Sequence, residues 1–434
     1  MPTKYLINGG RPLSGVVRLD GAKNAVTKQL VASLLTDEPC TLHNVPKNQE
    51  VFSVLEMLSE LGMESTWLGE DSLLVQTKEI KNIAIKSEYS GTNRIPILVI
   101  GPLLYRAQEA FVPMAGGCNI GSRPVDFHVN ALRAFGAEIT ENEDGYHAKS
   151  SRIQGCVIEL PYPSVGATEN ILLTAVLATG TTVIKNAAVE PEIIDTILLL
   201  QKMGALVHID TDRKIIIEGV EKLAGANHNI IPDRIEAASF AIAAIVTNGH
   251  LEIQNARQSD MISLLNVVRK VGGGFDVGEQ GITFFRSKSH LSCVHVETDV
   301  FPGFSTDWQP MLVSLLTQSE GVSVIHETVY ENRFGYTQML RDMGANISLS
   351  KDCLGSKSCR FLGRGYQHSC IVHGLTILSG RKMQIPDLRA GFAYVVAALI
   401  ANGESEISGI KYLERGYAKV VEKLKLLGAK IEEQ

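Results

Sequence analysis

The chain has 434 residues, of which 45% are hydrophobic and 20% are charged, a composition typical of a folded globular protein rather than a disordered one. Its 41 Lys and Arg against 47 Asp and Glu leave a formal net charge of −6, which argues against nucleic acid as the main partner. No apolar run reaches the roughly 18 residues of a membrane-spanning helix, and the first residues lack a signal-peptide pattern. We therefore expect a cytoplasmic protein of two or three domains, whose seven cysteines are mostly free thiols.

One pattern recurs six times along the chain. A helical pattern ends at a Gly that stands beside a small or apolar residue, and a short strand follows. The six Gly residues, spaced at similar intervals, are Gly62, Gly136, Gly204, Gly272, Gly344 and Gly428. Each is predicted to end its helix in the left-handed conformation that Gly adopts easily. The chain is therefore expected to consist of six repeated units.

Each unit is predicted to contain two helices of different kinds. The first is apolar on all sides, as in DRIEAASFAIAAIVTNG and DLRAGFAYVVAALIANG, so we expect it to be buried. The second is amphipathic, as in EIIDTILLLQKMGA, and short alternating strands accompany it. Buried helices inside a shell of short mixed sheets give an inside-out α/β fold. An ordinary doubly wound sheet is disfavoured, because its strands would be the continuous apolar runs.

Cations stand at similar places near the ends of these elements. A helix N-terminus carries partial positive charge and free N–H groups, so a Lys or Arg beside it makes an anion site. One such cation is usually a solvated surface residue, but five at equivalent places favour a site for a small polyanion, such as a phosphate with a carboxylate. The five residues are Lys23, Arg94, Arg333, Arg389 and Arg415.

The Gly-rich segment over residues 113–128 differs from its surroundings. Cys118 lies at its tip with Arg123 nearby, and a neighbouring cation favours a reactive thiolate. Because free Cys is normally buried, we interpret Cys118 as a functional acid, base or nucleophile rather than a structural thiol. Asp307 in GFSTDWQP and Asp387 in PDLRAG each begin a helix. Either could be a helix N-cap or a general base, and the residues alone favour neither.

The last interval contains an extra Gly-rich stretch, Lys351–His373, which is predicted to be a peripheral hairpin. It contains three Cys and two His: Cys353, Cys359, Cys370, His368 and His373. The Cys–x5–Cys spacing and the lack of a CxxC pair argue against a zinc site, so no metal is predicted. The chain also lacks GxxxxGK[ST], GxGxxG, HExxH and GxSxG, which disfavours several common enzyme classes.

The chain resembles the UDP-N-acetylglucosamine 1-carboxyvinyltransferase family of enolpyruvyl transferases in segments that follow in order along nearly its whole length. These are GAKNA, GGCNIGSRPVDFH, SVGATENILL, PDRIEAASF, STDWQ, ETVYENRF, DLRA and ERGY. The resemblance implies transfer of the enolpyruvyl group of phosphoenolpyruvate to the 3-hydroxyl of UDP-N-acetylglucosamine, the first committed step of peptidoglycan synthesis. It implies no metal or organic cofactor. The sister enzyme, 5-enolpyruvylshikimate 3-phosphate synthase, shares the fold but has neither the Cys loop nor GAKN.

The resemblance also implies two inside-out α/β domains, each of three repeated βαβαββ-like units with buried helices. Residues 23–232 would form the first domain, and residues 1–22 with 233–434 the second. The active site would lie in the cleft between the domains. The expected protein is a monomer or weak homo-oligomer that binds neither nucleic acid nor membrane.

Five residues acquire roles in the chemistry by their motif positions. Cys118 would be the general acid that protonates the methylene carbon of phosphoenolpyruvate, and it would be the residue that fosfomycin alkylates in Cys-bearing members. Asp307 would accept the proton of the sugar hydroxyl through an addition–elimination reaction with a tetrahedral intermediate. The phosphate would be held by Lys23, Arg123 and Arg415.

Further residues acquire binding roles by the same resemblance. Arg333 and Arg389 would hold the carboxylate of phosphoenolpyruvate. Arg94 would add positive charge, Asn24 would contact the sugar, and Asp387 matches a further functional Asp. The uridine diphosphate site would be lined by Pro124, Asp126, His128, Ser164, Val165, Gly166 and Val329.

Tyr162 departs from the family pattern, in which Lys is common at this place near the diphosphate. Three alternatives stay open, of which only the first follows from this departure and from the extra Lys351–His373 stretch. The first is enolpyruvyl transfer to a different nucleotide acceptor. The second is a non-catalytic regulator that binds UDP-sugars, although the chain keeps Lys23, Cys118, Asp307 and Arg389. The third is an elongated repeat scaffold that binds proteins.

Overall fold

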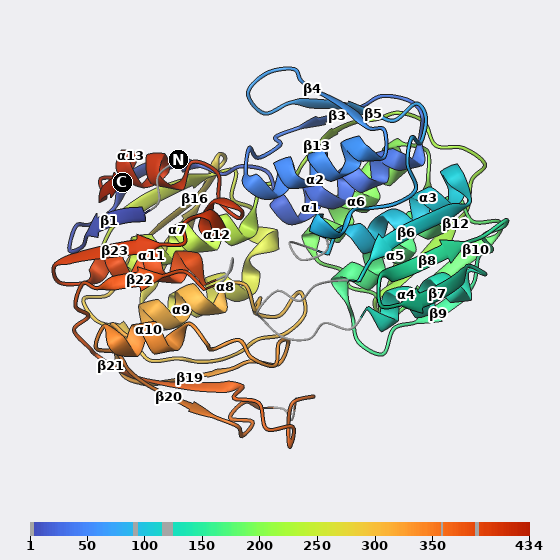
Figure 1. Ribbon diagram of the computed structural model, residues 1–434. Coiled ribbons are helices and arrows are strands. Elements are labelled where there is room, and N and C mark those ends of the chain that lie inside the picture. The colour runs from blue at the N-terminus through green and yellow to red at the C-terminus, as the bar shows by residue number, and fades with distance from the viewer. Residues whose placement is uncertain (1–3, 90–93, 115–124, 357–358, 387–389) are drawn as a thin grey trace. The chain divides into compact units, whose positions relative to one another are not determined.

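In a computed structural model, the chain is described except for residues 1–3, 90–93, 115–124, 357–358 and 387–389 (Figure 1). The chain divides into two compact units. Unit 1 holds Met1–Asp20 and Pro232–Gln434, and unit 2 holds the described residues between Gly21 and Ile231. Each unit has its own hydrophobic core. Among the described residues, no helix combines the length and the apolar character needed to cross a bilayer.

The described part of unit 2 forms three sheets around helices. In hydrogen-bonding order the sheets are β13 (Asn227–Asn229), β3 (Cys40–His43), β5 (Leu73–Gln76), β4 (Glu64–Trp67); β6 (Glu109–Pro113), β8 (Gly145–Lys149), β7 (Glu138–Asn142); and β11 (Leu206–Asp210), β12 (Lys214–Glu218), β10 (Thr181–Lys185), β9 (Val157–Glu159). The helices are α1 (Lys23–Ala32), α2 (Gln49–Glu60), α3 (Ile100–Ala107), α4 (Asp126–Ala134), α5 (Val165–Ala175) and α6 (Pro191–Lys202).

The described part of unit 1 also forms three sheets. They are β22 (Lys382–Gln384), β23 (Glu404–Ser408), β1 (Lys4–Asn8), β24 (Lys430–Glu433); β15 (Gly273–Val277), β16 (Gly281–Arg286), β14 (His250–Gln254), β2 (Ser14–Arg18); and β17 (Leu291–Ser292), β19 (Ser319–His326), β21 (Ser369–Gly374), β20 (Asn346–Ser350), with β18 (His295–Glu297) also on β19. The helices are α7 (Arg234–Val246), α8 (Ile262–Val271), α9 (Gln309–Leu316), α10 (Thr337–Asp342), α11 (Gly391–Ile400), α12 (Lys411–Glu414) and α13 (Val420–Leu426).

The sheets repeat one pairing scheme. In five of them, one strand pairs parallel with one neighbour and antiparallel with another, which in turn pairs antiparallel with a further strand, as β14 does with β2 and with β16 and β15. In the sixth sheet, β6 likewise pairs antiparallel with β8, which pairs antiparallel with β7. In place of a parallel strand, β6 has a single parallel bridge between Ala84 and Phe111. The predicted repeat is therefore confirmed at the level of strand pairing.

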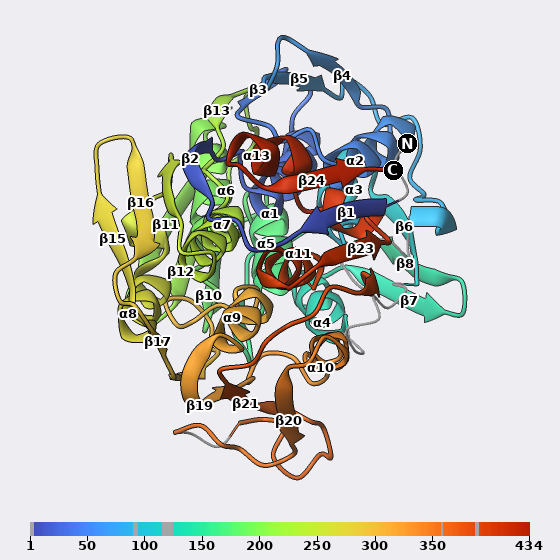
Figure 2. The ribbon, with the colours of Figure 1, turned by 90° about the vertical axis from the view of Figure 1, so that its left-hand side faces the viewer.

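The buried helices are also confirmed. Every residue of α9 is buried, as is every residue but one of α7 and of α11. In Figures 1 and 2 these three helices lie at the centre of unit 1 with the sheets around them. Phe240 of α7 packs edge-on against Phe392 of α11, and Ser314 of α9 donates to the Ala393 carbonyl at 3.0 Å. A helix that is apolar on all sides is expected to be buried on all sides, as these three are.

The six repeated Gly residues all have positive φ, between 93° and 114°. Five follow the second helix of their unit, and Gly272 is itself the C-cap of α8. This confirms the predicted helix ends, because a side chain at a left-handed position is strained.

Candidate functional site

Two of the predicted site residues, Asp307 and Arg333, form an ion pair in unit 1. Nη2 of Arg333 lies 3.1 Å from Oδ1 of Asp307, and it also donates to the Thr306 carbonyl at 3.3 Å. The Arg333 side chain is 3% exposed and the Asp307 side chain 16%. Helix α9 begins after Asp307, with Trp308 as its N-cap. The N-cap position of α9 is therefore occupied by Trp308 and not by Asp307, whose carboxylate is held in an ion pair instead.

A buried carboxylate that sequence reasoning missed, Glu327, organises the loop before Arg333. Glu327 accepts a hydrogen bond from the Thr306 hydroxyl at 2.9 Å and from the N–H groups of Val329 at 2.8 Å and Tyr330 at 3.0 Å. Burial raises the pKa of Glu327, while Arg333 and these hydrogen bonds lower it. Its position as the first residue of the ETVYENRF segment was the available signal.

Arg415 lies at the end of α12, also in unit 1, and is half-buried. Two residues later, burial raises the pKa of Tyr417, and the negative charges of Asp233, Glu236 and Asp307 raise it further. The ERGY segment therefore lies within electrostatic range of Asp307.

In unit 2, a second group of predicted residues lies at the first turn of α5. Ser164 is the N-cap, and its hydroxyl accepts a hydrogen bond from the Ala167 N–H at 3.4 Å. A side chain at Gly166 would come within 3.2 Å of the His128 ring, so the ring packs directly against this turn. Ser164, Val165 and Gly166 are all half-buried. A helix N-terminus of this kind suits phosphate oxygens.

His128 is uncharged in this setting. It is buried, and its Nδ1 lies 3.1 Å from the Asn170 amide nitrogen. Burial, and secondarily the positive charge of Arg94, lowers the pKa of His128 to about 3. Arg94 therefore lies within electrostatic range of His128. Asp126, the first residue of α4, is exposed.

Lys23 and Asn24 are the first two residues of α1, and both are half-buried. The N-cap, Ala22, contributes no side-chain cap. One turn later, Lys28 donates to the Asn24 carbonyl at 2.8 Å and lies 3.6 Å from Oε1 of Glu169 in α5. The α1 and α5 turns are thus connected through a buried ion pair, which sequence reasoning missed.

The titration of Glu169 provides a test of this buried pair. Burial raises the pKa of Glu169 from 4.5 to about 7, although Lys28 opposes the shift. Between these two values the folded chain holds a proton that the unfolded chain has lost, so stability falls as pH rises through this window. We expect the difference in unfolding free energy, wild type minus Glu169→Gln, to decrease from pH 4.5 to pH 7 by up to about 1.4 kcal/mol per pH unit.

Urea unfolding across this pH range measures the difference directly. Glu218→Gln, at an exposed position of β12, is the matched control and is expected to show no such slope. A pH-independent difference for Glu169→Gln would contradict the assignment.

The extra stretch forms the tip of the hairpin between β20 and β21. That this stretch is peripheral to the site stays a prediction, and one contact joins it to a predicted site residue, because the Arg360 guanidinium donates to the carbonyl of Val329. Val329 is one of the residues predicted to line the uridine diphosphate site.

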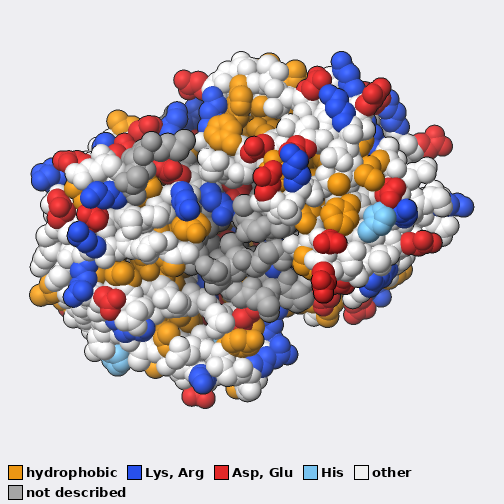
Figure 3. Space-filling view, in the orientation of Figure 1, with side chains coloured by type: hydrophobic (Ala, Val, Ile, Leu, Met, Phe, Trp, Pro, Cys, Tyr) orange, Lys and Arg blue, Asp and Glu red, His pale blue; other side chains and the backbone are white. Residues whose placement is uncertain are grey.

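On the face of the molecule drawn in Figure 3, acidic and basic side chains are interspersed.

Part of the predicted site lies outside the residues that the structure describes. The predicted residues that lie outside the described part of the chain are Cys118, Arg123, Pro124, Asp387 and Arg389. Tyr162, at the atypical position, is half-buried, and its carbonyl accepts a hydrogen bond from the Ser164 N–H at 2.7 Å.

Comparison with known proteins gives consistent matches over the whole chain. A family model described as EPSP synthase (3-phosphoshikimate 1-carboxyvinyltransferase) matches residues 7–424. Proteins named UDP-N-acetylglucosamine 1-carboxyvinyltransferase are 52% identical in Protochlamydia amoebophila, over 98% of this chain and 93% of the relative, and 49% identical in Chlamydia pneumoniae, over 97% and 93%.

Solved structures share the fold. The enolpyruvyl transferase NikO from Streptomyces tendae matches with a TM-score of 0.87 over 99% of both chains, at 22% identity. An EPSP synthase from Acinetobacter baumannii matches with a TM-score of 0.77 over 100% of both chains, at 17% identity.

Proposed function

The chain belongs to the EPSP synthase family of carboxyvinyltransferases, and from this membership we propose that it transfers the enolpyruvyl group of phosphoenolpyruvate to the 3-hydroxyl of UDP-N-acetylglucosamine. Phosphate is released, and the product serves peptidoglycan synthesis. The observation that carries the proposal is 52% identity, over 98% of the chain, to a relative named for this activity. The fold is consistent with it, because one structural neighbour is titled an enolpyruvyl transferase and another an EPSP synthase.

The proposed reaction has two steps. In the addition, the sugar 3-hydroxyl loses its proton to Asp307, its oxygen bonds to C2 of phosphoenolpyruvate, and C3 receives a proton from the Cys118 thiol. In the elimination, C3 loses a proton, the C2–O bond to phosphate breaks, and the carbon–carbon double bond reforms. Protonation of carbon is intrinsically slow, so a positioned acid accelerates the addition.

The geometry around Arg333 supports this assignment. The ion pair holds the Asp307 carboxylate in a fixed orientation, which suits a group that accepts a proton from a bound hydroxyl. Nε of Arg333 is buried without a hydrogen-bond partner among the described residues. A buried donor left in this state is costly, and a carboxylate oxygen of phosphoenolpyruvate would satisfy it.

Binding of the nucleotide is proposed for unit 2. The free N–H groups at the start of α5 would bind the diphosphate, with Arg94 and the neutral ring of His128 beside them. Lys23, Arg123 and Arg415 would hold the leaving phosphate, and Arg333 and Arg389 the carboxylate. Fixed cations of this kind stabilise developing charge without reorganisation. Residues of both units would thus act on the same pair of substrates, with the two units serving as the two functional domains.

The cellular setting is proposed from the family resemblance. The protein would act in the cytoplasm, as a monomer or weak homo-oligomer, with no metal or organic cofactor in the reaction. Tyr162 is the residue whose departure from the family pattern would fit a different nucleotide acceptor.

Phosphate release from phosphoenolpyruvate tests the proposal. We expect release to require UDP-N-acetylglucosamine, with little release when UDP-glucose, uridine monophosphate or shikimate 3-phosphate replaces it. Release with another nucleotide alone would keep the chemistry and replace the acceptor. UDP-N-acetylglucosamine binding without release for any acceptor would instead favour a non-catalytic regulator.

A further inference from the structure

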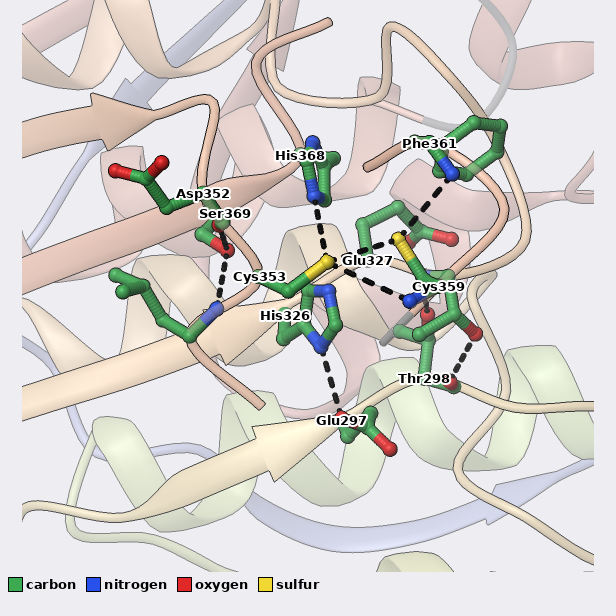
Figure 4. A network of polar contacts seen from close by, with 12 residues as sticks. Glu297, Thr298, His326, Glu327, Asp352, Cys353, Cys359, Phe361, His368 and Ser369 are labelled. Atoms are coloured by element: carbon green, nitrogen blue, oxygen red, sulfur yellow. Dashed lines mark hydrogen bonds and ion pairs between the residues drawn. The ribbon is translucent and has the colours of Figure 1, made fainter. Parts of the chain in front are cut away.

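Four potential metal ligands converge where the β20–β21 hairpin folds over the end of β19. They are His326, the last residue of β19, with Cys353, Cys359 and His368 from the hairpin tip (Figure 4). One ligand atom of each lies within 4.8 Å of the others. Sγ of Cys353 lies 3.5 Å from Sγ of Cys359 and 3.3 Å from Nε2 of His368. Tetrahedral zinc, with Zn–S of about 2.3 Å and Zn–N of about 2.0 Å, places its ligand atoms roughly 3.3 to 3.8 Å apart.

His326 is oriented as a metal ligand would be. Its ring is fully buried, and Nδ1 lies 2.8 Å from Oε2 of Glu297. Nε2, on the other side of the ring, is directed at the Cys353 sulfur (Figure 4) and has no hydrogen-bond partner among the described residues. A carboxylate on one nitrogen and a metal on the other is the usual arrangement of a zinc-bound His. The unpaired buried nitrogen therefore points to a missing ligand.

The two ring nitrogens of His368 also have different partners. Nδ1 lies 2.8 Å from the Tyr366 carbonyl, so it carries the ring proton and donates it, which leaves the lone pair of Nε2 for a metal. The sulfurs receive backbone N–H groups as well: that of Cys359 points at Cys353, and that of Phe361 at Cys359, both at 3.4 Å. N–H groups aimed at sulfur stabilise thiolates, the form that binds metal.

The backbone also closes tightly over this group. At Gly355 a Cβ atom would lie 1.8 Å from Oε2 of Glu297 and 2.1 Å from Nδ1 of His326. Only Gly allows the hairpin to pass this close to the His326–Glu297 pair. The other two candidates of the same stretch lie apart: Cys370 is buried in β21, where burial raises the pKa of its thiol to about 12, and His373 is exposed.

We propose that His326, Cys353, Cys359 and His368 bind one Zn²⁺ ion in a structural site. Two thiolates and two imidazoles in tetrahedral spacing favour zinc over the hard cations, and four protein ligands leave no open position for catalysis. A disulfide between the two cysteines would account for their proximity, but not for the two His nitrogens directed at them. The spacing within Lys351–His373 did not predict this site, because the fourth proposed ligand, His326, lies outside that stretch, on β19.

The proposed ion would fix the hairpin against the candidate active site. Glu327, next to His326, donates its N–H to the His368 carbonyl at 2.8 Å, and the hairpin places Arg360 on the Val329 carbonyl. A zinc ion would therefore hold in place the loop that carries Val329 and leads to Arg333. The proposal on metal binding is independent of the substrate that the enzyme uses.

The test measures metal in the full-length protein, purified under reducing conditions. We expect about one zinc per chain by elemental analysis, and release by a strong chelator. Co²⁺ added to the metal-free protein should give thiolate-to-metal charge transfer and tetrahedral d–d bands. Cys353→Ser and Cys359→Ser should each weaken Zn²⁺ affinity more than about tenfold.

Matched controls separate this result from general damage. Cys293→Ser and His373→Gln change exposed residues of the same types outside the site, and both should keep one zinc per chain. The Cys variants should retain the wild-type circular dichroism spectrum when zinc-free. Zinc-free wild-type protein that takes up neither Zn²⁺ nor Co²⁺, or that shows two fewer thiols than its seven cysteines because of a disulfide, would overturn the proposal.

Discussion

Cys118→Ala is expected to lower acceptor-dependent phosphate release by about 10²- to 10⁴-fold, the usual contribution of a positioned general acid. The physical reason is that C3 of phosphoenolpyruvate must gain a proton before the tetrahedral intermediate can form. Alanine has no proton to give, and water would have to replace the thiol without its fixed position. The rate is measured as phosphate released per enzyme at saturating substrates, with kcat and KM determined separately.

The exposed thiol Cys293 offers a control of the same residue type, and Cys293→Ser should retain full activity. Substrate binding should survive in Cys118→Ala, so the loss should appear in kcat. Fosfomycin should inactivate the wild type and add covalently to Cys118, and the Cys118→Ala protein should carry no label. Phosphate release near the wild-type rate in Cys118→Ala would refute the role of this thiol.

The second large effect is expected for Asp307→Asn, again about 10²- to 10⁴-fold in kcat. An amide of the same shape keeps an oxygen for Arg333, but it cannot accept the proton of the sugar hydroxyl. The substitution also removes the negative charge that pairs with the 3%-exposed Arg333 side chain, so a loss of stability is expected as well. Urea unfolding must therefore accompany the kinetics, so that loss of folding is not mistaken for loss of catalysis.

Asp299→Asn supplies the comparison, since Asp299 is an exposed carboxylate in the same unit. It should change neither kcat nor the unfolding midpoint appreciably. If folded Asp307→Asn protein released phosphate as fast as the Asp299→Asn control, Asp307 would not be the base. A loss confined to KM would instead assign Asp307 to substrate binding.

The repeated architecture could be predicted from sequence because it is encoded locally. A Gly at the same place in every unit reports a left-handed helix end, and helices that are apolar on all sides have to be buried. Both features hold in the structure, as at Gly204 after α6 and throughout α9. Neither depends on knowing which elements pack together.

The interactions that depend on packing were the ones missed. Asp307 could not be told from a helix N-cap until Arg333 was placed 3.1 Å from it. Glu169 and Lys28 belong to different helices, so nothing local predicts their pairing. The hairpin showed the same limit, because the fourth potential ligand, His326, stands on β19, far from Cys353 in the chain.

The most direct test of enolpyruvyl transfer is to run the reaction in D₂O with phosphoenolpyruvate and UDP-N-acetylglucosamine, and to examine the nucleotide product by mass spectrometry and NMR. We expect a carboxyvinyl ether at the 3-oxygen with deuterium in its vinyl methylene, because C3 gains a deuteron in the addition and loses a proton in the elimination. A nucleotide left unmodified while phosphate is released would contradict the proposed transfer. A vinyl ether free of deuterium would contradict the addition–elimination route.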